Sequence, residues 1–147
     1  MNVLISACLL GVDCRYDGEN KKIDKALIQR LQKKYHLVPI CPEIYGGLPT
    51  PREPGERQGD RVITKSGLDV TEQYMHGAHV ALHFARLLDC KMAILKERSP
   101  SCGSVHIYDG TFTGSLKVAD GITAELLMQN GIRVYGESQI PQLLSEK

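Results

Sequence analysis

The sequence predicts one α/β domain: a three-layer, Rossmann-like fold with an open parallel sheet of about four or more strands and helices on both faces. Two observations predict it. Short apolar runs alternate with amphipathic segments, and this strand and helix order produces parallel sheets with helical crossovers. The length of 147 residues lies in the common range for one domain. We therefore expect residues 1–147 to form a single domain.

The first half of the chain is expected to supply two strands and one helix. Residues 2–7 (NVLISA) form a short apolar run typical of a buried parallel strand. Residues 23–35 predict an amphipathic helix, because apolar side chains recur there at spacings of three and four. Residues 36–40 (HLVPI) predict the second strand. Residues 42–60 are rich in proline, glycine and charge, so we expect a long irregular loop there.

The second half continues the alternation. Its patterns predict a helix at 70–90, a strand at 91–97, an irregular segment at 98–114, a helix at 118–131, a strand at 132–136 and a terminal helix at 138–147. Thr71 is expected to cap the first of these helices. Asn130 and Gly131 are expected to close the second.

Charge and composition exclude several classes of protein. The 18 Lys and Arg residues balance 17 Asp and Glu residues without a long block of either sign, so bulk charge does not predict binding to a nucleic acid polymer. Neither a membrane span nor a secretory leader is predicted, because the apolar runs are too short. Glycine-rich phosphate motifs are absent, so NAD and ATP are not implied. We expect a cytoplasmic protein that does not bind membranes.

Five cysteines are spread along the chain: Cys8, Cys14, Cys41, Cys90 and Cys102. In a reducing compartment, such a set indicates metal binding or catalysis more readily than disulfides. No CxxC pair occurs, so the fold would have to bring the thiols together.

Three of these cysteines follow predicted strands. Cys8 comes after the first strand, Cys41 after the second, and Cys102 lies in the loop after the third. Because ligands bind beyond the carboxyl ends of the strands in open α/β sheets, we expect these thiols to share one edge. Three thiolates could complete a zinc site with a fourth ligand, or hold three irons of a [4Fe–4S] cluster and leave the fourth iron open.

Three segments resemble the signature blocks of a known family. The segments SACLLGVDCRYDG, CPEIYGGLPTPREP and LKERSPSCGS occur in the expected order, and the resemblance spans nearly the whole chain. The family is that of the thiouracil desulfidases, in its short stand-alone form.

The resemblance implies a [4Fe–4S] cluster as the cofactor, held by Cys8, Cys41 and Cys102. Its open iron would bind the sulfur of a thiolated nucleobase or nucleoside, and oxygen from water would replace that sulfur. The resemblance also implies that Glu43 and either Ser99 or Ser101 assist the chemistry. An iron that binds the sulfur would withdraw electrons from the C–S bond, and Glu43 could deprotonate the water.

Other side chains in the cysteine-bearing loops are candidates for substrate binding. Arg15, Arg52 and Arg98 could orient the ligand, or could pair with neighbouring carboxylates instead. Tyr16 and Tyr45 could stack on a base. The predicted substrate-binding set is Arg15, Tyr16 and Arg52.

The remaining cysteines and the histidines have simpler interpretations. Cys14 could be a fourth ligand, a protective spare thiol or a loop residue, and the loop residue is favoured because a fourth protein sulfur would close the site. Cys90 is expected in the core. His76, His79 and His83 share one helical face and could bind a metal, but a solvated surface is favoured.

Two other functions compete with the desulfidase hypothesis. One is a metal-binding module without turnover, which holds structural zinc or an iron–sulfur sensor cluster. The other is a thiol-based hydrolase or transferase that uses Cys102 or Cys8 alone, with His106 as the histidine nearest to Cys102 in sequence.

Overall fold

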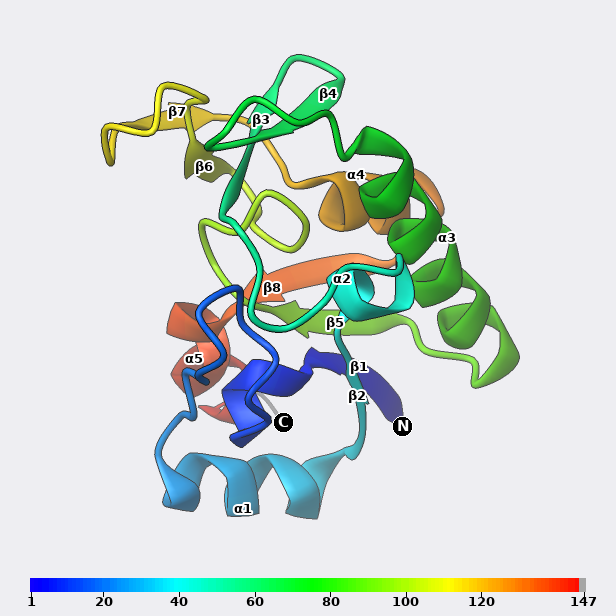
Figure 1. Ribbon diagram of the computed structural model, residues 1–147. Helices are drawn as coiled ribbons and strands as arrows, with labels where there is room; N and C mark the ends of the chain where they lie inside the picture. Colours follow the sequence, from blue (N-terminus) through cyan, green and yellow to red (C-terminus); the bar gives the residue numbers. More distant parts are fainter. Residues whose placement is uncertain (146–147) are drawn as a thin grey trace.

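The computed structural model describes residues 1–145 and contains a four-stranded parallel sheet (Figure 1). The strands are β1 (Asn2–Ser6), β2 (His36–Ile40), β5 (Met92–Leu95) and β8 (Arg133–Gly136), in the order β2-β1-β5-β8. Each neighbouring pair is parallel, and the last residues Ser6 and Ile40 lie opposite each other. The carboxyl ends of the strands therefore meet at one edge, and the predicted fold class is confirmed.

Helices cover both faces of the sheet (Figure 1). One face carries α1 (Lys25–Lys34) and α5 (Ile140–Ser145), and the other carries α3 (Thr71–Leu87) and α4 (Ile122–Gln129).

Strand β1 shows why both faces are filled. Val3 and Ile5 pack with Leu31 of α1, whereas Leu4 packs with Leu127 of α4. All five side chains are fully buried, and each such burial stabilises the fold by about 1.5–3 kcal/mol. A strand buried on both faces is continuously apolar, which is why the sequence revealed it.

The two predicted irregular segments contain secondary structure, so that expectation was wrong in part. The first holds the short helix α2 (Pro42–Tyr45) and the strand β3 (Gly55–Gln58), which pairs with β4 (Arg61–Thr64) just beyond that segment. The second holds β6 (His106–Tyr108), which pairs with β7 (Leu116–Val118). Strands β3 and β4 form an antiparallel hairpin around a Gly-Asp turn, which is a recognised hairpin signal.

Other boundaries differ by a few residues. The 3₁₀ helices η1 (Ala7–Leu10) and η2 (Glu137–Gln139) follow β1 and β8 directly. The last two residues of the predicted terminal helix, 146–147, lie outside the described residues.

The expectation that Thr71 caps α3 was wrong. Val70 occupies the capping position, and the Thr71 hydroxyl instead accepts a hydrogen bond from the Val62 N–H of β4 at 2.9 Å. Asp69 accepts the N–H of Thr71 at 3.0 Å. Thr71 therefore connects α3 to the hairpin. Within residues 1–145, no helix has the length and apolar character needed to cross a membrane.

Candidate active site

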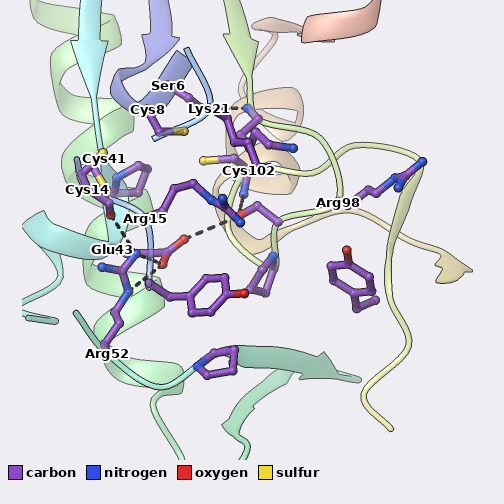
Figure 2. Close-up of a pocket in the computed structure, with 18 of the residues that line it drawn as sticks. Ser6, Cys8, Cys14, Arg15, Lys21, Cys41, Glu43, Arg52, Arg98 and Cys102 are labelled. Atoms are coloured by element: carbon purple, nitrogen blue, oxygen red, sulfur yellow. Dashed lines mark hydrogen bonds and ion pairs between the residues drawn. The ribbon is translucent and has the colours of Figure 1, made fainter. Parts of the chain in front are cut away.

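A cavity of about 560 Å³ lies at the carboxyl edge of the sheet. Four thiols line it, those of Cys8, Cys14, Cys41 and Cys102, and Figure 2 shows them on neighbouring loops. The predicted meeting of Cys8, Cys41 and Cys102 at one edge is therefore confirmed. Cys90 lies away from the cavity, buried between the sheet and α3 as expected.

The loops that carry the thiols leave the sheet in different directions. The chain runs outward from β1 to β2 on one side and from β5 to β8 on the other, so the loops after β1 and β5 flank the crevice between them. Cys8 lies in η1 directly after β1, and Cys102 lies in the loop that follows β5. The order of the strands therefore creates the opening that the thiols line.

Close packing of α2 on α3 fixes the position of Cys41. A Cβ atom at Gly77 of α3 would lie 1.9 Å from the Pro42 carbonyl oxygen, so only glycine allows the two helices to approach this closely. Pro42 stands between Cys41 and Glu43. The bare backbone of α3 therefore positions a thiol and a carboxylate together.

Cys14 lies in a loop, as the favoured interpretation expected, and it lines the cavity together with the other thiols. Its side chain is buried, and the Cys41 Sγ lies 3.7 Å from the Cys14 carbonyl oxygen. Contact with the Cys41 thiol lowers the pKa of Cys14, but contact with Cys8 and burial raise it more, to about 11. No local pattern signals this position, because a residue 38 positions further on, Arg52, holds the Cys14 carbonyl in place.

The thiols suit a cationic centre. Burial and the nearby Glu43 carboxylate raise the pKa of Cys102 to about 12, and contact with Cys14 and burial raise the pKa of Cys41. A bound metal reverses this preference, because a coordinating thiol loses its proton. Soft thiolate ligands select zinc, copper(I) or iron–sulfur centres.

The number of thiols fits either kind of centre. Within the described part of the chain, residues 1–145, no group of three or more His, Cys, Asp or Glu side chains is arranged to hold a metal ion. Three thiolates could complete a zinc site with a fourth ligand, or hold three irons of a [4Fe–4S] cluster.

Glu43 forms the polar side of the cavity. Arg52 donates to its Oε2 from Nε at 3.0 Å and also from Nη2, and the Ser99 Oγ lies 3.5 Å from its Oε1. Tyr74 of α3 also lines the cavity, and burial together with the Glu43 carboxylate raises the pKa of Tyr74 well above its usual value. Tyr74 therefore keeps its proton. Sequence reasoning missed Tyr74, because nothing in a helical apolar stripe distinguishes it.

The structure separates the two candidate serines. Ser99 lines the cavity, and its Oγ accepts the N–H groups of Ser101 and Cys102, each at 3.1 Å. Ser101 is fully buried, and its hydroxyl pairs with the Thr123 hydroxyl at 2.8 Å. Ser99 can thus act in the cavity, whereas Ser101 joins the cysteine loop to α4.

The predicted substrate-binding residues all line the cavity. Arg15 pairs with Asp17 at 3.3 Å, and its guanidinium lies 5.4 Å from the centre of the Tyr16 ring. Arg52 pairs with Glu43 and not with the adjacent glutamate in sequence.

Other candidates lie at the cavity edge or outside it. Arg98 lies on the other side of the cavity from Cys14 and Cys41 (Figure 2). Tyr45 does not line the cavity and packs on Phe84 instead, with ring centres 5.5 Å apart, so a stacking role for Tyr45 was wrong. The three histidines of α3 lie on its exposed surface, as the favoured interpretation expected: His76, His79 and His83.

The far wall of the cavity comes from the two hairpins and was also missed. Tyr108 and Phe112 line it, and Glu56 of β3 holds the turn between β6 and β7. The Glu56 Oε1 accepts the N–H groups of Gly110 at 3.0 Å and Phe112 at 3.1 Å. The Gly59-Asp60 turn is a signal that could have revealed the first hairpin, but no local signal connects Glu56 with residues more than 50 positions away.

The fold and the cavity define a class: an α/β protein with a thiol-lined site at the carboxyl edge of a parallel sheet. A family model described as 2-thiouracil desulfurase matches residues 3–139. The chain therefore belongs to the 2-thiouracil desulfurase family.

Two individual proteins support this membership. A protein of Bacillus subtilis (strain 168), named "Uncharacterized protein YbbK", is 43% identical over 152 residues, which cover 97% of this chain and 99% of the relative. A solved structure described as [4Fe-4S]-dependent thiouracil desulfidase TudS is 46% identical, with a TM-score of 0.92, and the match covers 97% of this chain and 94% of that chain.

Proposed function

We propose that this protein removes sulfur from thiouracil or a similar thiolated pyrimidine, with a [4Fe–4S] cluster held by Cys8, Cys41 and Cys102. The observation that carries the proposal is the convergence of these three thiols on one cavity in a member of this family. The similar solved structure is described as a [4Fe-4S]-dependent desulfidase, which supports both the cofactor and the reaction.

The donor set fits the cofactor. Cys8, Cys41 and Cys102 would hold three irons of the cluster, and the fourth iron would be open to a small ligand. When bound, the cluster supplies a Lewis-acidic iron that polarises the C–S bond of the substrate. This arrangement leaves Cys14 beside the ligands without requiring that it be one.

The protein side chains supply the proton chemistry. A water molecule adds its oxygen to the ring carbon, the C–S bond breaks, and sulfur leaves as sulfide, so that no electrons are exchanged. Glu43 takes the proton from the attacking water. The Ser99 hydroxyl faces the Glu43 Oε1 and orients this carboxylate. Arg15 and Tyr16 lie at the cavity wall, where they hold the ring and exclude water.

The five cysteines carry free thiols, which supports a reducing compartment such as the cytoplasm of a bacterium. The reaction with water assigns the enzyme to the hydrolases.

The test is sulfide release. The protein is loaded anaerobically with iron and sulfide and mixed with 2-thiouracil, and uracil and sulfide are both measured. We expect equal amounts of the two products from the loaded protein and none from the protein without iron. A fully loaded protein that releases no sulfide from any thiolated pyrimidine would support the sensor or structural function instead.

A further inference from the structure

Arg52 has no donor left for a substrate. Its Nε and one Nη2 hydrogen bind Glu43, and the other Nη2 hydrogen binds the Cys14 carbonyl oxygen at 3.1 Å. Its Nη1 donates to the Pro49 carbonyl and to the Thr50 hydroxyl, each at 3.2 Å. A guanidinium has five N–H groups, so all five are engaged within the protein.

These contacts hold Glu43 in one orientation. Both donors to Glu43 meet its Oε2, which leaves Oε1 on the side of Ser99. The side chains of Arg52 and Glu43 are only 7% and 14% exposed, so little water competes for the pair. Charge-assisted hydrogen bonds in such a setting are short and directional.

Arg52 also connects two loops of the site. Its backbone N–H donates to the Tyr16 carbonyl at 2.7 Å, and its Nη2 holds the Cys14 carbonyl. The loop after β1 is thus attached to the segment after α2. A lysine could not reproduce this, because its ammonium is a single point and not a planar fork.

We propose that Arg52 is a positioning residue for Glu43 and not a substrate ligand: it occupies Oε2 so that Oε1 faces Ser99 and the cavity. This inference rests on the proposed function, in which Glu43 handles the proton. It replaces the substrate-binding role that the sequence predicted for Arg52.

The experiment is a double-mutant cycle on the iron-loaded protein, with Glu43→Gln, Arg52→Lys and the double variant. Loss of a general base lowers kcat by about 10²–10⁴-fold, and misplacement by about 1 Å costs up to about 10²-fold. We expect Arg52→Lys to lower kcat about 10–100-fold with KM changed less than about threefold. We expect the double variant to have the kcat of Glu43→Gln alone, because Arg52 acts through Glu43.

Arg57→Lys is the matched control. Arg57 is 9% exposed, pairs with Glu125 at 2.8 Å and donates to two carbonyl groups, but it does not line the cavity. The Arg57→Lys variant should lower the unfolding temperature as much as Arg52→Lys does and leave kcat unchanged. Iron per chain and thermal unfolding are measured for every variant, and we expect normal iron content in Arg52→Lys.

The outcomes distinguish the two proposals. Full activity of Glu43→Gln would remove the proton role from the proposed function. If Glu43→Gln is impaired, a normal kcat in Arg52→Lys would overturn the positioning role, as would a large rise in KM or a further loss in the double variant. If Arg52→Lys does not fold, Arg52→Gln replaces it. If neither Arg52→Lys nor Arg52→Gln folds while Arg57→Lys does, Arg52 serves stability alone and the proposal is overturned.

Discussion

Replacement of Gly77 by alanine tests how the site is positioned. By helix propensity alone, the change would stabilise α3 by about 1 kcal/mol. The structure predicts the opposite, because the new Cβ would lie 1.9 Å from the Pro42 carbonyl oxygen and 2.7 Å from its carbon. Ordinary contact begins at 3.4 Å, so α2 must move by about 1.5 Å.

The magnitude follows from the two opposing terms. Overpacking costs about 1–3 kcal/mol, and the upper end applies because the atoms met belong to the backbone. After the gain in helix propensity, we expect a net loss of about 2 kcal/mol in the free energy of unfolding. The shift also carries Cys41 and Glu43, and misplacement by about 1 Å can lower the rate about 100-fold.

Urea unfolding measures the stability, and iron per chain with sulfide release measures the site. His79→Ala is the matched control, because His79 lies on the exposed surface of the same helix. The control should retain stability, iron and activity. If Gly77→Ala were as stable and as active as the unchanged protein, close packing of α2 on α3 would not be what positions Cys41 and Glu43.

Three further predictions concern individual side chains. Ser99→Ala should lower kcat, whereas Ser101→Ala should mainly lower the free energy of unfolding, by about 1–3 kcal/mol, because it leaves the buried Thr123 hydroxyl unpaired; kinetics and urea unfolding separate the two. Cys14→Ser should keep its iron content after anaerobic loading, and loss of iron would make Cys14 a ligand. Hydrogen bonds from the hydroxyl and N–H of Thr71, and one from Arg61, lower the pKa of Asp69 to about 2. Its contribution to stability is therefore present above pH 3.8 and lost as the pH falls through 2, so Asp69→Asn should destabilise at pH 7 and much less at pH 2; an equal effect at both would contradict this.

The sheet could be predicted because each of its strands leaves a pattern in a short stretch of sequence. A strand such as β1 is buried on both faces, so its apolar run is visible in the sequence. The strand ends then placed Cys8 and Cys41 at one edge without further information. The alternation of elements was sufficient for the fold class.

The hairpins and the inner details of the site could not be predicted in this way. Glu56 and Arg57 are buried, which a charged sequence does not suggest. They are satisfied by partners more than 50 residues away, at Gly110 and Glu125. Cys14 enters the cavity for a similar reason, because a distant arginine holds its backbone.

The measurement that tests the central claim most directly is iron content in single cysteine variants after anaerobic reconstitution. Cys8→Ala, Cys41→Ala and Cys102→Ala should each lose the cluster, seen as loss of visible absorbance and of about four irons per chain. Cys90→Ala, which changes a core thiol outside the cavity, should keep both. A folded Cys102→Ala variant that retained a full cluster would contradict the account.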